Sequence, residues 1–216
     1  YDDFLAGREA FVALLGDTLF LEDFGIANCK FFVLSDGTEG ELWVGSESNF
    51  KDFHCGPIRV LVDKQELLTG VILPYHQAEE IEQVESLRQQ IMWFWHEFSH
   101  FVKAMGRDQL WFAYGSLEIM RGMCVNLARL RHNFRDGNVG EEPYFKVEID
   151  MPVELLDPLR ETFCPLEAAA MHRAAVLILR YYQKTARDLA QNYNIAYPER
   201  LANLMIAQFE TINAGI

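Results

Sequence analysis

The segment His96-Glu97-Phe98-Ser99-His100 has the most recognisable arrangement of reactive side chains in this sequence. Two histidines four residues apart, with a glutamate after the first, can hold zinc on a helix and supply a general base. The apolar stripe argues against this role, because Phe98 is at its centre and both histidines then project from the opposite face, beside Trp93 and Lys103. Glu118 is a conceivable third ligand, but nothing specific marks it. We therefore expect no zinc at His96 and His100, and a zinc metallopeptidase remains only an alternative.

Glu41 is a second candidate for chemistry. It follows the strong hairpin turn Asp36-Gly37 and begins a short run rich in strand-forming residues. Because alternate residues of a strand face the same side, Glu41 and Trp43 should point together. A lone carboxylate on a strand is usually a solvated edge residue, so its residue type alone indicates no function.

A third candidate is one face of the helix predicted for residues 109–132. Two glycines inside a helix each cost about 1 kcal/mol relative to alanine, so they need a reason. Close packing of a neighbouring helix is one reason. The other is a floor for a flat, polar ligand that needs room, an aromatic wall and a carboxylate. The face consists of Trp111, Gly115, Glu118 and Gly122, flanked by Tyr114 and Arg121.

Composition and charge restrict the class of protein. Hydrophobic residues make up 50% of the 216 residues and charged residues 24%, which is typical of a globular chain and not of a disordered one. The net charge of −13 disfavours nucleic acid and favours cationic ligands. No apolar run reaches the roughly 18 residues of a membrane-spanning helix. The four cysteines are far apart and no leader is visible, so we expect free thiols and a cytoplasmic protein.

The predicted elements fall into two groups, which indicates an α+β protein with domains at residues 1–75 and 76–216. The first group is a small α/β lobe, with a helix at 2–15 and strands at 29–34, 41–44 and 58–62. The second is a bundle, with helices at 79–105, 109–132, 152–163 and 165–192 and a last helix that ends near residue 211.

Taken together, these segments resemble the aminoglycoside 6-adenylyltransferases and, more loosely, the aminoglycoside and lincosamide nucleotidyltransferases. Residues 31–44 look like the hairpin that carries the family's third active-site carboxylate. Residues 56–64 look like the strand that ends in Leu-x-Asp-Lys, and residues 94–121 like the start of the helical domain, which ends here in Glu-Ile-x-Arg. Lys184, Leu189-Ala190 and Tyr197-Pro198 look like the closing helices. The segments occur in the family's order.

The resemblance implies a partial nucleotidyltransferase α/β lobe with a short mixed sheet, followed by a helical substrate-binding domain. It implies transfer of a nucleoside monophosphate from a Mg²⁺-bound triphosphate, with ATP as the expected donor, to a hydroxyl of an aminoglycoside-like antibiotic. The partners would be the nucleotide and a small cationic acceptor, with no nucleic acid or membrane. The chain would be a monomer or a homodimer.

The resemblance also assigns roles to residues. Glu41 becomes the catalytic base or a carboxylate beside the metal ions, and Asp63, Lys64 and Lys184 become nucleotide-binding residues. The acceptor would meet carboxylates and aromatic side chains of the helical domain, for which the candidates are Trp93, Glu97, Trp111, Tyr114 and Glu118.

One departure from the family pattern matters. The family's Gly-Ser turn on a helix followed by an Asp-x-Asp strand does not occur in these 216 residues, and the position of Glu41 implies that it lies upstream of Tyr1. We therefore expect the 216 residues alone to be inactive. A catalytically incomplete relative, or one that acts on a different acceptor, is the alternative.

Overall fold

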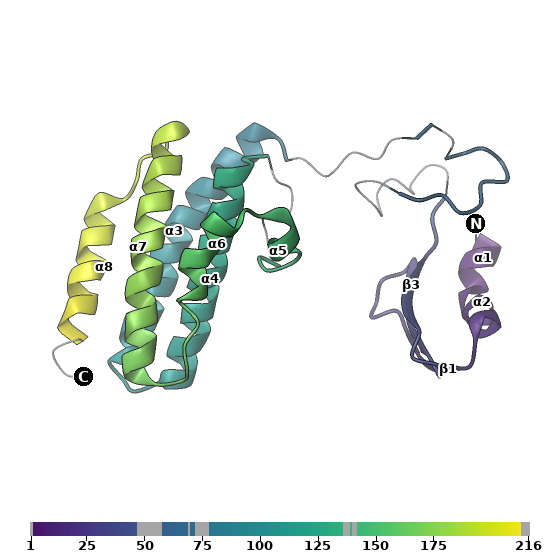
Figure 1. The fold of residues 1–216 in the computed structure, drawn as a ribbon, viewed down its shortest axis with the longest axis horizontal. Coiled ribbons are helices and arrows are strands. Elements are labelled where there is room, and N and C mark those ends of the chain that lie inside the picture. The colour runs from purple at the N-terminus through teal and green to yellow at the C-terminus, as the bar shows by residue number, and fades with distance from the viewer. Residues whose placement is uncertain are drawn as a thin grey trace. The chain divides into compact units, whose positions relative to one another are not determined.

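The chain divides into two compact units, Tyr1–His76 and Gln77–Ile216 (Figure 1). The computed structural model describes residues 2–46, 58–68, 70–71, 78–135, 139 and 142–212. Each unit is described by itself below. The α+β class predicted from the sequence is confirmed, because a small sheet lies in the first unit and long helices form the second.

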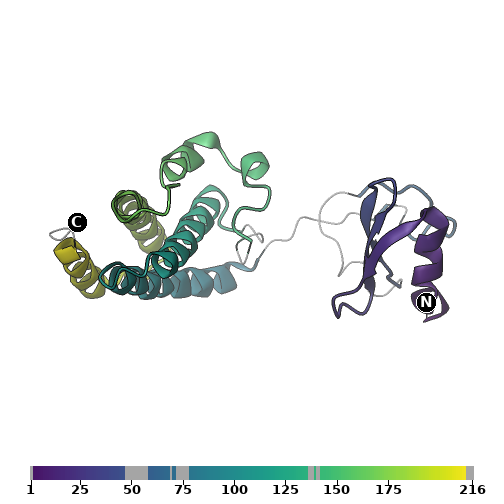
Figure 2. The same cartoon turned by 90° about the horizontal axis from the view of Figure 1, so that it is seen from below.

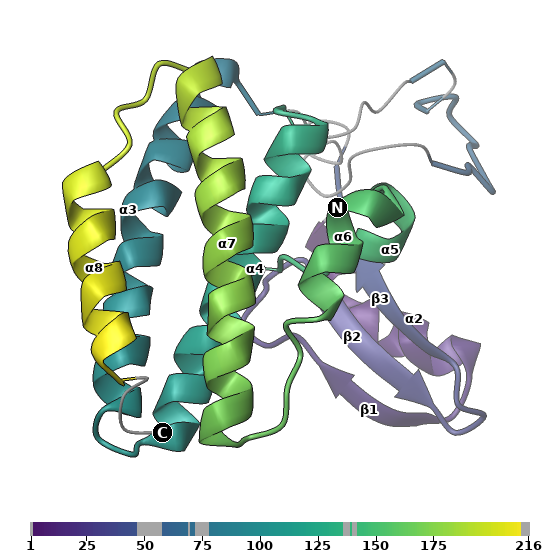
Figure 3. The ribbon, with the colours of Figure 1, turned by 60° about the vertical axis from the view of Figure 1, so that its left-hand side comes forward.

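The first unit has two short helices and three strands, namely α1 (Asp2–Ala6), α2 (Arg8–Leu15), β1 (Thr18–Glu22), β2 (Cys29–Leu34) and β3 (Glu39–Trp43). The strands lie in the order β1-β2-β3, and both pairs are antiparallel. Helix α2 contacts β1 and β2 (Figure 3). The predicted helix at 2–15 is therefore present but interrupted at Gly7.

The hairpin between β2 and β3 forms as the sequence predicted. Gly37 has a φ of 85°, a conformation that glycine adopts without steric cost. The Asp36 carboxylate accepts a hydrogen bond of 2.9 Å from the Thr38 amide and closes the turn. This turn brings Glu41 opposite Phe31 in the β2–β3 register.

The described sheet differs from the prediction in three respects. Strand β1 was missed, and the described strands are all antiparallel where a mixed sheet was expected. Residues 58–62 were predicted as a strand, yet they have no regular secondary structure. The reason is burial: Leu61 is 80% exposed and Val62 70% exposed. Strand-forming side chains favour a sheet where they can pack against neighbours, and Leu61 and Val62 pack little against the described residues.

The second unit is a helical bundle of α3 (Glu80–Met105), α4 (Leu110–His132), α5 (Val147–Asp150), α6 (Val153–Arg160), α7 (Ala168–Asn192) and α8 (Glu199–Ile212). Helix α3 packs against α4 and α8, while α4 also packs against α6 and α7. Figure 2 shows these helices from another side, with α8 in yellow at one edge of the bundle. None of the described helices combines the length and the apolar character needed to cross a membrane.

Aromatic side chains fill the centre of this bundle. The ring of Phe94 on α3 stacks on Tyr182 of α7, with 3.4 Å between centroids. The Tyr182 hydroxyl donates a hydrogen bond of 2.9 Å to the carbonyl oxygen of Ile91. Phe98 meets Phe209 of α8 edge to face. These contacts fix the rotation of α3 and decide which of its polar residues reach the surface.

Candidate functional site

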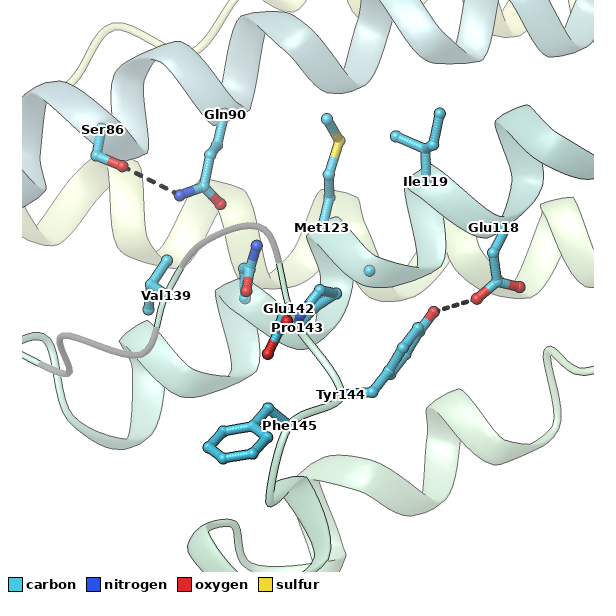
Figure 4. A pocket seen from close by; sticks show the side chains of 12 residues that line it. Ser86, Gln90, Glu118, Ile119, Met123, Val139, Glu142, Pro143, Tyr144 and Phe145 are labelled. Atoms are coloured by element: carbon cyan, nitrogen blue, oxygen red, sulfur yellow. Dashed lines mark hydrogen bonds between the residues drawn. The ribbon is translucent and has the colours of Figure 1, made fainter. Parts of the chain in front are cut away.

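A hollow of about 780 Å³ runs along α4 in the second unit (Figure 4). Helices α3 and α4 and the segment before α5 form its wall. We call it the Glu118 hollow. Its lining residues are Ser86 and Gln90 from α3, Glu118, Ile119, Gly122, Met123 and Asn126 from α4, and Val139, Glu142, Pro143, Tyr144 and Phe145.

Gly122 shapes the hollow by letting the chain approach α4 closely. A Cβ atom at this position would lie 3.0 Å from Cγ of Pro143, which is tighter than ordinary van der Waals contact. The other helical glycine, Gly115, would meet nothing within 4 Å. Of the two reasons considered for these glycines, close packing therefore applies at Gly122 only.

Glu118 is held at the edge of the hollow by two donors. The Tyr144 hydroxyl donates a hydrogen bond of 2.5 Å to Oε1 of Glu118 (Figure 4). The guanidinium of Arg121, one turn further along α4, pairs with Oε2. Burial, and then the hydrogen bond to Glu118, raises the pKa of Tyr144 well above its ordinary value. The phenol therefore remains a hydrogen-bond donor across the physiological pH range.

Arg121 is fully buried and fixed on its other sides. Its Nε donates to Oγ1 of Thr162, and a terminal nitrogen donates to the Thr162 carbonyl, both at 2.9 Å. Its guanidinium carbon lies 4.2 Å from the centre of the Phe163 ring. A planar guanidinium with this many partners is a rigid support. Arg121 thus fixes the Glu118 carboxylate to the segment that follows α6.

The other predicted acceptor residues do not line the Glu118 hollow. Trp111 is 84% exposed, and Tyr114 is half-buried against the core. Trp93 lines a neighbouring hollow of about 600 Å³ together with His96. That hollow shares Ser86 and Gln90 with the Glu118 hollow. Of the five candidates, only Glu118 lines the Glu118 hollow.

Glu97 does not face solvent as an acceptor-binding residue would. It is 6% exposed, and its Oε2 lies 3.9 Å from Nδ1 of His100. The physical reason is helical spacing, because position 97 follows Phe94 by three residues and precedes Phe101 by four, so it lies on the apolar stripe. We therefore correct the expectation that Glu97 contributes to an open binding face.

Two residues of the hollow were missed in the sequence. Neither Glu142 nor Tyr144 was identified as a candidate. Both lie in an irregular segment where no periodicity indicates which side chains point inward. A weak indication existed at Gly122, since a glycine inside a helix often marks a close approach of other chain.

Glu41 lies on the exposed face of β3. The Trp43 side chain donates a hydrogen bond of 2.9 Å from Nε1 to Oε2 of Glu41, which confirms that the two side chains point together. Glu39 lies on the same face, two residues earlier. Burial, and then the charge of Glu41, raises the pKa of the Cys29 thiol on the neighbouring strand.

The carboxylates near Glu41 do not by themselves make a magnesium site. Mg²⁺ in proteins takes octahedral oxygen ligands, usually from more than one carboxylate together with phosphates. Among the described residues, only His96, Glu97 and His100 bring three potential metal ligands within reach of one another. Glu41 could supply one ligand of a magnesium site, and other carboxylates would have to complete it.

The three predicted nucleotide-binding residues lie in different units. The Asp63 carboxylate accepts hydrogen bonds of 2.9 Å from the amides of Leu67 and Leu68, and so closes a local turn. Asp63 and Lys64 line a hollow of about 450 Å³ that also includes Gly45 and Ser46. Lys184 is in the second unit, on α7, in a groove with Arg180 and Arg187. The groove also includes Glu210, and Arg187 is ion-paired with Glu199.

These features define the class of protein. The chain has a small sheet unit with an exposed carboxylate, followed by a helical bundle with a carboxylate-lined hollow. The family model described as streptomycin adenylyltransferase matches residues 28–212. The chain therefore belongs to the streptomycin adenylyltransferase family. Members of this family are nucleotidyltransferases, so the resemblance noted in the sequence is confirmed.

A solved structure has the same fold. The chain is similar to the aminoglycoside 6-adenyltransferase from Bacillus subtilis, with a TM-score of 0.54 and 13% sequence identity. The similarity covers 98% of this chain and 84% of that one. At this identity the match supports the fold alone. No curated protein matches the chain by sequence.

Proposed function

We propose that this protein transfers a nucleoside monophosphate from Mg²⁺–ATP to a hydroxyl group of an aminoglycoside-like antibiotic, and so confers resistance. Membership of the streptomycin adenylyltransferase family supports the reaction class. The acceptor binds in the Glu118 hollow. Free thiols at Cys29, Cys124 and Cys164 suit a cytoplasmic location, where nucleotides are abundant.

The Glu118 hollow is the observation that carries this proposal. Glu118 and Glu142 both line it; Oε2 of Glu118 pairs with the buried guanidinium of Arg121, while Arg121 itself is not a lining residue. A cationic ligand would therefore meet two carboxylates and no exposed cation among the lining residues. A partly buried carboxylate binds an ammonium group more strongly than a fully solvated one does. Apolar walls at Ile119 and Met123 suit the rings of a sugar.

The transfer also needs a base for the attacking hydroxyl. Glu41 is our candidate, because its carboxylate is exposed and oriented by the Trp43 indole. A carboxylate within hydrogen-bond reach of an alcohol can accept its proton as the bond to the α-phosphorus forms and the bond to the leaving pyrophosphate breaks. Asp63, Lys64 and Lys184 are proposed to bind the nucleotide. For Lys184 the support is its groove, since Arg180 beside it adds a second cation that a triphosphate could contact.

Turnover by the 216 residues alone is not expected. No Asp-x-Asp occurs in this sequence, so neither Gly-Ser pair is followed by the family's Asp-x-Asp strand, and the described residues around Glu41 do not complete a metal site. Incubation with Mg²⁺–ATP and streptomycin should therefore give no adenylylated drug by mass spectrometry. Formation of that product would show that our placement of the metal site is wrong.

A form of the protein that carries both motifs provides the positive test. With Mg²⁺–ATP and streptomycin it should produce a drug heavier by one AMP unit. Replacing Glu41 by Gln in that form should lower turnover by about 10²–10⁴-fold, the usual contribution of a general base. Glu39→Gln, two residues earlier on the same exposed face, is the matched control. If Glu41→Gln and Glu39→Gln had equal turnover, Glu41 would not be the catalytic base.

A further inference from the structure

The one group of metal-ligating side chains that gathers in the described part of the chain lies outside the Glu118 hollow. His96, Glu97 and His100 each offer a ligand atom, and these three atoms lie within 4.8 Å of one another. In a tetrahedral zinc site with bonds of 2.0–2.1 Å, neighbouring ligand atoms are about 3.3 Å apart. Small side-chain rotations therefore suffice to bring the three atoms around one ion.

The helix itself explains why these positions converge. Successive residues of an α-helix are separated by about 100° around its axis. Taking His96 as the origin, Glu97 lies at about 100° and His100 at about 40°, one turn further on. His100 thus lies between the other two in projection, and all three point into one sector. Glu97 itself can provide the third ligand, a possibility that the sequence argument did not consider.

The environment of Glu97 gives a second, independent reason. Its side chain is 8% exposed, and its ion pair with His100 is long, at 3.9 Å. Among the described residues, no Lys or Arg forms an ion pair with Glu97. A buried carboxylate with so little compensation is costly, and a bound divalent cation removes that cost.

The imidazoles are already oriented and open to solvent. The Trp93 ring lies 4.9 Å from that of His96, the two imidazole centres are 4.3 Å apart, and Phe112 lies 5.9 Å from His100. His96 is exposed and lines the hollow of about 600 Å³ that also contains Trp93. An ion can therefore enter from that side, between aromatic rings that restrict the imidazoles.

We propose that His96, Glu97 and His100 form a Zn²⁺-binding site on α3. Two imidazole nitrogens and one carboxylate oxygen suit zinc, and waters complete its coordination. The site differs from that of a zinc peptidase, because Glu97 is a ligand and is not a base held beside the metal. It is also separate from nucleotidyl transfer, so it stands or falls independently of the proposed function.

Calorimetric titration of the tag-free 216-residue chain with ZnCl₂ alone tests the site. We expect one Zn²⁺ per chain. His96→Ala, His100→Ala and Glu97→Gln should each raise Kd at least about tenfold, since even outer-shell carboxylates change metal affinity by 10–100-fold. His132→Ala, which removes an exposed histidine from the end of α4, and Cys164→Ser, which removes a partly exposed thiol, should leave Kd unchanged.

The outcomes separate cleanly. Circular dichroism first checks that each variant is folded, and the exposed position of His96 makes His96→Ala the variant least prone to misfolding. Absence of stoichiometric Zn²⁺ binding, or a Kd that does not change in His96→Ala, would overturn the site. Loss of binding in the histidine variants with an unchanged Kd in Glu97→Gln would overturn the three-ligand proposal and leave a histidine pair.

Discussion

At the scale of single residues, the hydroxyl of Tyr144 is the contact most open to a direct test. It donates to Glu118, which we propose as the anchor of the acceptor. Tyr144→Phe keeps the ring and removes this donor, so streptomycin affinity should fall about two- to tenfold, as expected for loss of one hydrogen bond of 0.5–1.5 kcal/mol. Tyr193→Phe is the control, because Tyr193 stacks on Phe134 and does not line the Glu118 hollow. Equal affinities of the two variants in calorimetry would exclude an anchoring role.

His172 gives a pH-dependent prediction. It is 9% exposed, stacks on Phe209, and shares a groove with Arg180, Lys184 and Glu210. Burial lowers the pKa of His172, so below about pH 6.5 the unfolded chain takes up a proton that the folded chain resists. Folding stability should therefore decrease as pH falls through that range.

Thermal unfolding of the His172→Gln variant measures this effect. Other histidines also titrate, so the quantity to compare is the loss of Tm between pH 7.5 and pH 5.5 in the two proteins. The Tm of the variant should fall less between pH 7.5 and pH 5.5 than the Tm of the wild-type chain, even if it is lower at both pH values. An identical loss in both would mean that His172 is protonated as easily when folded as when unfolded.

Residue roles were only partly predictable from the sequence. Glu118 could be selected because a carboxylate between two helical glycines is unusual. Glu97 was assigned to the wrong surroundings, although its spacing from Phe94 and Phe101 indicated burial. The roles of Tyr144 and Glu142 could not be predicted, because both lie in an irregular segment. That segment approaches α4 closely only because residue 122 is a glycine.

At the scale of elements, the two glycines of α4 form a matched pair. Gly115→Ala meets open space and should stabilise the chain by up to about 1 kcal/mol, the difference in helix propensity. At Gly122 the new methyl group would lie 3.0 Å from Pro143, so the same gain is offset and the wall of the Glu118 hollow is displaced. Gly122→Ala should therefore be less stable than Gly115→Ala and should bind streptomycin more weakly. Urea denaturation and calorimetry provide the two readouts, and the opposite order in either would refute this account of α4.

The long helices were predictable because each carries an apolar stripe over five or more turns. The expected ranges 79–105 and 109–132 agree with α3 and α4 to within one residue. Short strands gave weaker evidence. The run at 58–62 had suitable residues but no face to pack against, whereas Thr18–Glu22 pairs with β2 despite a largely exposed surface. Strand formation depends on pairing partners that a local sequence pattern does not reveal.

At the scale of the whole molecule, the division into two units predicts that the helical bundle is autonomous. Its aromatic core lies entirely within residues 77–216. A fragment of those residues should show cooperative unfolding and should bind streptomycin with the affinity of the full 216-residue chain. Circular dichroism and calorimetry check both points. A fragment that is unfolded, or folded but unable to bind, would show that the first unit is needed for the acceptor site.

The net charge also acts at the scale of the whole molecule. The net charge of −13 should attract a polycationic acceptor over a distance, and salt screens such a field beyond about 8 Å at physiological ionic strength. Contact with Glu118 is short-ranged and partly buried, so salt should weaken it less than it weakens the long-range attraction. Both the long-range attraction and the contact with Glu118 should contribute to the affinity for the acceptor. A variant that removes only the Glu118 charge distinguishes the two contributions.

Calorimetry with streptomycin, comparing Glu118→Gln with Glu82→Gln at low and high salt, is the most direct test of the central claim. Both changes remove one negative charge, but Glu82 is an exposed residue in the first turn of α3 and does not line the Glu118 hollow. We predict that wild-type binding weakens steadily as salt rises and that Glu118→Gln weakens it roughly tenfold or more, as loss of a charged hydrogen bond does. Glu82→Gln should have only a small effect, which disappears at high salt. Equal losses in the two variants, or equal binding of a neutral sugar, would contradict an acceptor site at Glu118.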